Sequence, residues 1–79
     1  MKIRVLIFGT LKRYIPNYDP KQGFEIEMPD GSRVQDLLAH LGIPKSEIPV
    51  ITIDYRMAGL EDKLVDKSQV SLIQMAHGG

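Results

Sequence analysis

Cysteine is absent from the 79 residues of this chain, and histidine occurs only twice. Without cysteine there are no disulfides, no thiolate metal sites and no cysteine nucleophile, and the redox compartment is left open. The two histidines, His40 and His77, lie far apart in the sequence, and two such ligands do not make a zinc site. We therefore expect no metal centre.

Long hydrophobic runs and an excess of charge of either sign are also missing. The longest apolar run near the N-terminus is Val5–Phe8, which is far too short for a membrane span or a signal-peptide core. Ten basic and ten acidic residues give a net charge of zero, so general affinity for nucleic acid is not expected. The length predicts one small domain, with a single core and no room for a deep enzyme cleft. A cytoplasmic location is expected.

Two strands are predicted in the N-terminal part. Lys2–Phe8 starts with clean alternation and turns apolar on both faces towards its end, which is typical of a central strand. Thr10 is expected to cap a short helical turn, and a loop follows over Pro16–Gly23, which contains Asn, Asp, Pro and Gly. Phe24–Met28 alternates apolar and acidic residues, which predicts a half-buried strand.

The clearest element of the sequence is a helix that follows a Pro-Asp-Gly turn. Ser32 and Gln35 have the spacing of a capping box, which predicts that the helix begins at Ser32. Gly42 is placed to end it. Apolar residues recur between these points with the spacing of one buried helical stripe, at Val34, Leu37, Leu38 and Leu41.

The C-terminal half predicts two more strands. Val50–Tyr55 is rich in β-branched residues, Arg56–Gly59 is interpreted as a turn, and Leu64 is the expected buried anchor of an irregular segment. Gln69–Met75 is the last predicted strand. The order of strand, strand, helix, strand and strand predicts an α+β fold, in which one helix packs across a sheet of four to five strands.

The usual catalytic residue sets are missing, and the acidic residues are expected in turns or on solvated faces. The feature that points to chemistry is the pair Gly78-Gly79, which follows the last predicted strand. A terminal carboxylate with a pKa near ~3.5 is ionised at neutral pH and must be activated, for example by adenylation, before it can accept a nucleophile. Two glycines, which lack Cβ, let the backbone enter a narrow channel on another protein. The alternative without a function is a frayed terminus that happens to be rich in glycine.

In this order of elements, the chain resembles the ubiquitin-like sulfur carriers. These include the small subunit of molybdopterin synthase and the sulfur carrier of thiamine biosynthesis. The resemblance covers nearly the whole chain. It is carried by Pro29-Asp30-Gly31-Ser32 leading into Val34 and Leu37-Leu38, by Leu64-Val65-Asp66 with Val70 and Leu72, and by Gly78-Gly79.

The resemblance implies a β-grasp domain over residues 1–75 and a flexible C-terminal tail over residues 76–79. It implies a carrier rather than an enzyme, in which Gly79 becomes an acyl-adenylate and then a thiocarboxylate and Gly78 gives steric access. The implied partners are an E1-like adenylating enzyme, which uses ATP, and the large subunit of a molybdopterin-synthase-like complex or another sulfur acceptor. No cofactor is expected to be bound to the chain itself.

The sulfur's destination stays open at this point. Small subunits of molybdopterin synthase commonly carry prolines before the tail, where this chain has Gln74 and Met75. A glutamine there is more like the thiamine carriers, whereas the length and the first strand are more like the molybdopterin type, which is the first choice. Alternatives are a protein modifier that forms isopeptide bonds through Gly79, and an interaction module without tail chemistry.

A partner-binding face follows from the alternation of the first and last strands. If Ile3, Val5 and Ile7 face the helix, the intervening side chains lie on the opposite face of the sheet near the base of the tail. An apolar cluster there predicts a binding site. The alternative is that the segment from Gly9 to Gly23 folds over this face. The predicted partner-binding residues are Leu6, Phe8, Ile73, Met75 and His77.

Overall fold

A computed structural model describes residues 1–47 and 49–74 of the chain. Its helices are α1 (Val34–Leu41) and two short 3-10 helices, η1 (Thr10–Tyr14) and η2 (Lys45–Glu47). Its strands are β1 (Lys2–Gly9), β2 (Phe24–Glu27), β3 (Val50–Ile53), β4 (Arg56–Ala58) and β5 (Gln69–Gln74). The predicted boundary after residue 75 lies outside the described residues.

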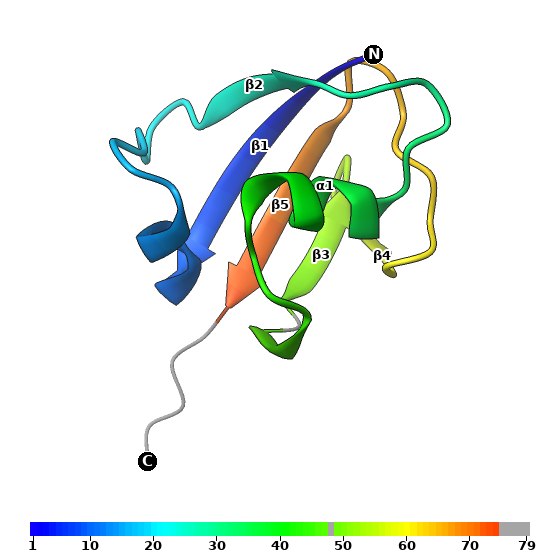
Figure 1. Cartoon of the computed structure of the whole chain (residues 1–79). Coiled ribbons are helices and arrows are strands. Elements are labelled where there is room, and N and C mark those ends of the chain that lie inside the picture. The colour runs from blue at the N-terminus through cyan, green and yellow to red at the C-terminus, as the bar shows by residue number, and fades with distance from the viewer. Residues whose placement is uncertain (48, 75–79) are drawn as a thin grey trace.

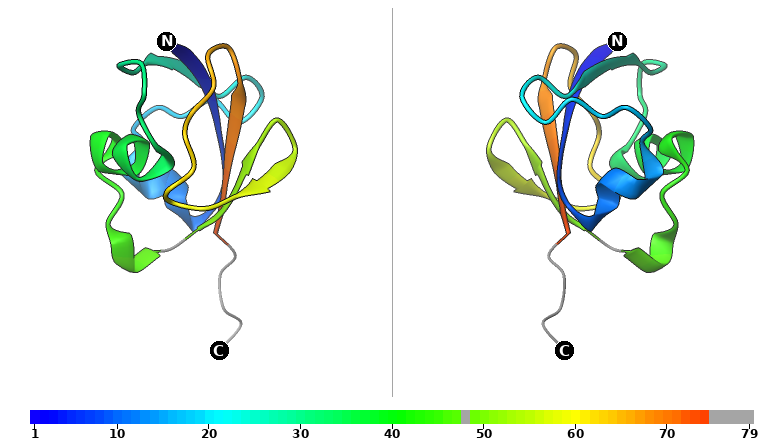
Figure 2. Two further views of the ribbon diagram at one scale, coloured as in Figure 1. Left: turned by 90° about the vertical axis from the view of Figure 1, so that its right-hand side faces the viewer. Right: turned by 90° about the vertical axis from the view of Figure 1, so that its left-hand side faces the viewer.

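The strands form one mixed sheet in the order β2-β1-β5-β3-β4. β1 and β5 are parallel neighbours at its centre, and the other pairs are antiparallel. α1 crosses one face of this sheet, and the two side views show η1 and η2 on the same side as α1 (Figures 1 and 2). The predicted α+β class, with one main helix across a mixed sheet, is therefore confirmed.

The core lies between α1 and the covered face of the sheet. Alternate residues of β1 point into it, so that Ile3 and Val5 are each 0% exposed and Ile7 is 2% exposed. Of the predicted helical stripe, Leu41 is only partly buried, and the rest is buried. The predicted anchor Leu64 is buried as well. The remaining core residues are Leu11, Met28, Val34, Leu37, Leu38, Ile43, Ile51, Val70 and Leu72.

The predicted start of the helix at Ser32 is wrong by one residue. The N-cap is Arg33, and its backbone N–H donates to the carboxylate of Asp36 at 2.8 Å. The hydroxyl of Ser32 instead donates back to the carbonyl of Pro29 at 2.7 Å, within the preceding turn. The first helical N–H groups need no side-chain cap from Ser32, because those of Val34 and Gln35 donate to loop carbonyls of residues 62 and 60.

The start of η1 also differs from its prediction. Gly9, not Thr10, occupies the N-cap position, and no side-chain hydrogen bond caps the helix. Gly9 has a φ of 86°, which a residue with a Cβ rarely adopts. The chain therefore turns into η1 through the glycine that ends β1, and Thr10 is the first residue of the helix.

The turn predicted at Arg56–Gly59 is wrong as well. Arg56–Ala58 is strand β4, which pairs with β3 in an antiparallel hairpin. The turn consists of Asp54 and Tyr55, with φ values of 49° and 71°. Two-residue hairpin turns with both φ values positive favour Asp-Gly or Asn-Gly. Tyr55 stands in the place of that glycine, so the sequence lacks the usual hairpin signal.

Candidate functional site: the root of the tail and the open face

The chain after β5 contains the residues for which tail chemistry is predicted. Gly78 and Gly79 lie outside the described residues, as do the predicted partner-binding residues Met75 and His77. The last described residue is Gln74, at the C-terminal end of β5. Five further residues span at most about 17 Å when fully extended. Any protein that receives the C-terminal carboxylate therefore comes close to this end of the sheet.

The backbone at this end of β5 is tightly held. Gln74 pairs with Gly9 at the end of the parallel β1–β5 ladder. A Cβ added to Gly9 would lie only 1.6 Å from the carbonyl oxygen of Gln74. Position 9 thus requires glycine for both its positive φ and its close approach to the neighbouring strand. β5 is also paired with β3 on its other side, so the root of the tail lies on a central strand.

A polar cluster around Glu47 joins η1, η2 and the end of β5. One carboxylate oxygen accepts a hydrogen bond from the hydroxyl of Tyr14 at 2.7 Å and another from the guanidinium of Arg13. The second oxygen accepts from the side-chain amide of Gln74 at 3.4 Å. The Tyr14 hydroxyl, and after it the Arg13 guanidinium, hold the pKa of Glu47 below its ordinary value, against the effect of partial burial. The sequence does not predict this cluster, because its members are far apart in the chain.

The face of the sheet opposite α1, called here the open face, carries the predicted partner-binding residues that the structure describes. Phe8, Ile73 and Val50 are register partners across β1, β5 and β3 and form a row next to Gln74. Leu6 lies in the next row, beside Ser71. Phe8 is 46% exposed and Val50 is 45% exposed. The apolar surface is therefore densest where the chain leaves the sheet.

The segment from Gly9 to Gly23 leaves this face largely open. Leu11 in this segment is 0% exposed and packs into the core on the helix side. The segment then passes around the edge of the sheet beside β1 (Figure 2). Only its end reaches the open face, where the carbonyl of Gln22 accepts a hydrogen bond from Arg4 at 2.7 Å. Gly23, the last residue of the segment, lies against the side chain of Leu6, but Phe8 is left 46% exposed. The predicted alternative, in which this segment covers the apolar cluster, therefore holds only at Leu6.

A shallow depression of about 450 Å³ lies on the open face. It runs from the apolar row near the root of the tail towards the β3–β4 turn. Its lining is formed by Leu6, Phe8, Thr52, Tyr55, Gln69, Ser71 and Ile73. Tyr55 and Val50 are exposed apolar residues that are not among the predicted partner-binding residues. Residues two apart on a strand share a face, so the spacing of Val50 and Thr52 predicts that both lie on the same side of β3. Nothing in the sequence predicts that Tyr55 lies in the turn.

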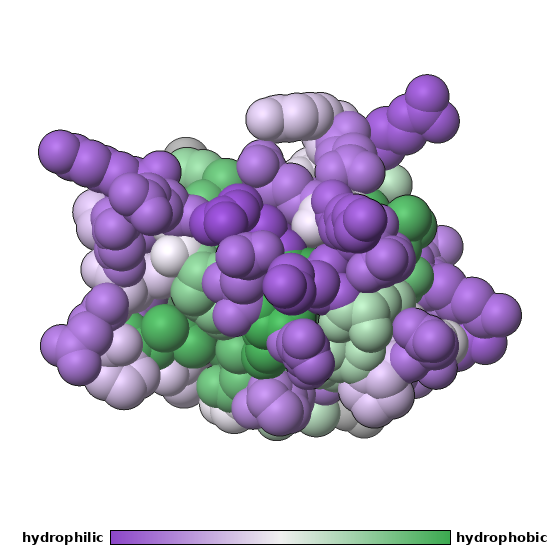
Figure 3. All heavy atoms as spheres, turned by 90° about the horizontal axis from the view of Figure 1, so that it is seen from above, coloured by the Kyte–Doolittle hydropathy of each residue, from purple (hydrophilic) through white to green (hydrophobic). Residues whose placement is uncertain are grey.

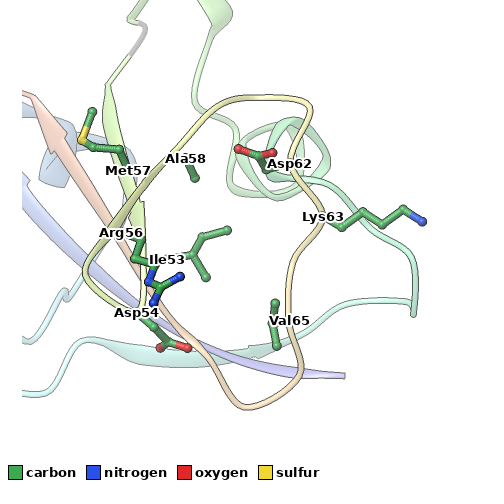
Figure 4. Close-up of a pocket in the computed structure, with 8 residues that line it drawn as sticks. All are labelled: Ile53, Asp54, Arg56, Met57, Ala58, Asp62, Lys63 and Val65. Carbon is green, nitrogen blue, oxygen red and sulfur yellow. The ribbon is translucent and has the colours of Figure 1, made fainter.

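A second depression, of about 680 Å³, lies at the β3–β4 hairpin (Figure 4). Its lining mixes charges of both signs, with Asp54 and Asp62 opposite in charge to Arg56 and Lys63. The carboxylate of Asp62 accepts the backbone N–H of Gly59 at 2.7 Å, so it stabilises the local turn. Within residues 1–47 and 49–74, no three acidic or histidine side chains come together as a possible metal site. This depression offers no catalytic arrangement.

The end of the molecule farthest from Gln74 contrasts with the root of the tail. Seen from above the view of Figure 1, it is covered mainly by hydrophilic side chains, with apolar ones visible between them (Figure 3). Here the carboxylate of Asp66 accepts the backbone N–H of Lys2 at 2.9 Å, which lowers the pKa of Asp66.

None of the described helices is long and apolar enough to cross a membrane.

A β-grasp domain with an exposed apolar face beside the exit of a Gly-Gly tail defines the class of small ubiquitin-like carriers. The chain belongs to the ThiS family, whose model matches residues 5–79 and so includes both terminal glycines. Proteins of this class are carriers that act with partner enzymes and are not catalysts themselves. No curated protein matches the chain significantly.

Several solved structures share the fold. A protein provisionally described as subunit 1 of the molybdopterin converting factor of Pyrococcus furiosus is 20% identical, with a TM-score of 0.71 and coverage of 96% of this chain and 99% of that one. SAMP1 from Haloferax volcanii is 13% identical, with a TM-score of 0.74 and full coverage of both chains. A complex of subunits 1 and 2 of the molybdopterin-converting factor of Helicobacter pylori contains a chain that is 21% identical, with a TM-score of 0.61 and full coverage of both chains.

Proposed function

We propose that this protein carries sulfur as a thiocarboxylate on Gly79, and that it donates this sulfur in the biosynthesis of molybdopterin. The observation that carries the proposal is the position of Gln74, the residue after which the tail begins. Gln74 is the last residue of a central strand, is fixed against Gly9, and lies beside the row of Phe8, Ile73 and Val50. The family match extends through the terminal glycines, which supports the same assignment.

The proposed chemistry starts from the ionised carboxylate of Gly79. One of its oxygens attacks the α-phosphorus of ATP on an adenylating enzyme, which releases pyrophosphate and leaves an acyl-adenylate. Hydrosulfide, HS⁻, then attacks the carbonyl carbon, and AMP leaves with the electron pair of the broken C–O bond while the sulfur loses its proton. The product is the thiocarboxylate, in which sulfur replaces one oxygen. Gly78 lets the backbone pass close to the walls of the enzyme's channel.

The open face is the proposed docking surface for these partners. Leu6, Phe8 and Ile73 present apolar area at the root of the tail, and a partner that covers them holds Gly79 within the tail's reach of about 17 Å. Met75 and His77 are proposed to join the same contact. The first partner is an E1-like adenylating enzyme, and the second is the large subunit of a molybdopterin-synthase-like complex.

The molybdopterin destination is supported by two of the neighbouring folds. The proteins from Pyrococcus furiosus and Helicobacter pylori are both described as subunits of a molybdopterin converting factor, and the second was solved with its subunit 2. A large-subunit partner for this chain is proposed on that basis.

Mass spectrometry of the protein from its native cell tests the sulfur step. We expect a sulfur-for-oxygen mass increase on the C-terminal peptide. A Gly-Gly remnant on lysines of other proteins, without the sulfur form, would instead indicate a protein modifier.

A one-residue extension tests the role of the carboxylate. Adding an alanine after Gly79 displaces the carboxylate but leaves β1 to β5 unchanged. We expect a normal melting temperature and no ATP–pyrophosphate exchange with the adenylating enzyme. Adenylation of the extended protein, without prior trimming, contradicts the tail mechanism.

A further inference from the structure

The turn between β3 and β4 contains an unfavourable residue. Asp54 and Tyr55 both have positive φ, at 49° and 71°. Aspartate tolerates this conformation, but a bulky aromatic residue is a real outlier there, and glycine would adopt it without strain. Strained residues persist where the surroundings hold them, and they are concentrated at functional sites. Tyr55 is therefore a candidate functional residue.

Hydrogen bonds to the first residue of β5 hold this turn in place. The carboxylate of Asp54 accepts the backbone N–H of Gln69 at 2.8 Å, and the backbone N–H of Asp54 donates to the carbonyl of Gln69 at 2.8 Å. The side-chain amide of Gln69 also donates to the hydroxyl of Tyr55 at 3.4 Å. Both the strained backbone and the phenol are thus tied to a central strand.

The side chain of Tyr55 faces outward, at one end of the depression on the open face. The residue is 84% exposed, the highest value among the exposed large hydrophobic residues of the described chain. It lines the same depression as Phe8 and Ile73. Its neighbour Gln69 lies four residues before Ile73 on β5, or about 13 Å along the strand. The apolar surface therefore extends from the root of the tail to a second aromatic side chain.

We propose that Tyr55 is an anchor for the adenylating enzyme, with its ring against an apolar surface of that enzyme and its hydroxyl at a polar group. This proposal rests on the proposed function. The occupant is argued from the tail: a protein that takes in Gly79 must come within about 17 Å of Gln74, and the depression begins beside Gln74, at Phe8 and Ile73. Tyrosines are strongly enriched among residues that dominate binding energy.

The proposal predicts that stability and binding change in opposite directions. Tyr55→Gly removes the strain of the turn and the ring together. We expect its melting temperature to rise by about 2–5 °C. We expect its KM as substrate in ATP–pyrophosphate exchange, with the purified adenylating enzyme of the same organism, to rise at least about tenfold with kcat unchanged. Tyr55→Phe keeps the ring and should stay within about threefold of the wild-type KM.

Lys67→Gly is the matched control. Lys67 has a φ of 64°, is exposed and precedes β5, and it does not line the depression. Its replacement should raise the melting temperature in the same way and leave KM unchanged.

Each outcome of this experiment decides the proposal. A wild-type KM for Tyr55→Gly, or an equal rise in KM for Lys67→Gly, contradicts the role of Tyr55 as an anchor. Adenylation of the wild-type protein would still support the proposed function in that case. A lower melting temperature for Tyr55→Gly overturns the strain argument. A wild-type protein that is not adenylated overturns the proposed function and the anchor together.

Discussion

The two faces of β1 differ sharply although their residues alternate along one strand. On the covered face Ile3, Val5 and Ile7 are at most 2% exposed, whereas Phe8 on the open face is 46% exposed. Leu6 and Phe8, at the tail end of the open face, are as apolar as the three covered residues, although Lys2 and Arg4 share their face. At this end of β1, residue type does not distinguish the two faces. The difference is that α1 covers one side and that nothing in residues 1–47 and 49–74 covers the row at the tail end of the other.

This comparison shows that equal apolar residues have unequal roles. Burial against α1 removes apolar area from water in the isolated chain, and this stabilises the fold by about 25 cal/mol per Å². On the open face, Phe8 and Val50 remain nearly half exposed in the isolated chain, and a partner can bury them. Substitutions on the covered face should therefore act on folding, and substitutions on the open face should act on association.

The largest expected effect separates the two faces directly. Leu38→Ala removes methyl groups from a residue that is 4% exposed, and we expect a loss of about 2–5 kcal/mol in the free energy of unfolding. Phe8→Ala removes a larger side chain from the open face, yet we expect a loss of no more than about 1 kcal/mol. Urea denaturation of both variants measures these values.

The loss of affinity for a partner should follow the opposite order to the loss of stability. Phe8→Ala should weaken binding to the adenylating enzyme, whereas folded Leu38→Ala should bind normally. Equal losses of stability in the two variants would contradict the comparison, because they would place Phe8 in the core.

Much of this division was predictable from the sequence. Alternation in β1 and the helical spacing of Leu37 and Leu38 depend on near neighbours, so they give the covered face and the helix directly. The helix start was misplaced because distant loop carbonyls, and not Ser32, accept the first helical N–H groups. The hairpin was missed because Tyr55 occupies the place of a glycine.

The candidate site was predictable only in part. Leu6, Phe8 and Ile73 follow from the same alternation once the first and last strands are neighbours. The cluster of Arg13, Tyr14 and Glu47 does not, because tertiary packing of η1 against η2 brings these side chains together.

The next effect concerns the root of the tail, where Gly9 and Gln74 pair at the C-terminal ends of β1 and β5. Gly9→Ala introduces a Cβ that would lie 1.6 Å from the carbonyl oxygen of Gln74, so β1 and β5 must separate there. Gly31→Ala is the matched control, because Gly31 has a similar φ of 87° with no heavy atom within 4 Å of the added Cβ. We expect a cost of about 1–2 kcal/mol for Gly31→Ala and a larger one for Gly9→Ala.

Adenylation should separate these glycine variants further. Only Gly9→Ala moves the backbone from which the tail starts, so only this variant should lower kcat/KM. An equal loss of stability in both variants would show that positive φ, and not the contact with Gln74, makes Gly9 necessary.

The smallest expected effect concerns Glu47, which lies on the helix side of the root and joins it to η1. Its pKa in the folded protein is lowered, chiefly by the Tyr14 hydroxyl and then by Arg13. A carboxylate with a lowered folded-state pKa binds fewer protons in the folded than in the unfolded chain. Its contribution is therefore fully present above the unfolded-state pKa of about 4.3 and is lost as the pH falls through the folded-state value.

Glu47→Gln should accordingly be less stable than the wild type at pH 7, and this difference should shrink as the pH falls below about 4.3. Urea denaturation at pH 7 and at pH 3 measures the difference, with Glu61→Gln as a control that removes the same charge from an exposed position. Asp66 also has a lowered pKa and is unchanged in both variants, so its own acid titration cancels in the comparison. A difference between Glu47→Gln and the wild type that stays constant from pH 7 to pH 3 would show that the amide disturbs packing, and that the charge of Glu47 contributes nothing to the root of the tail.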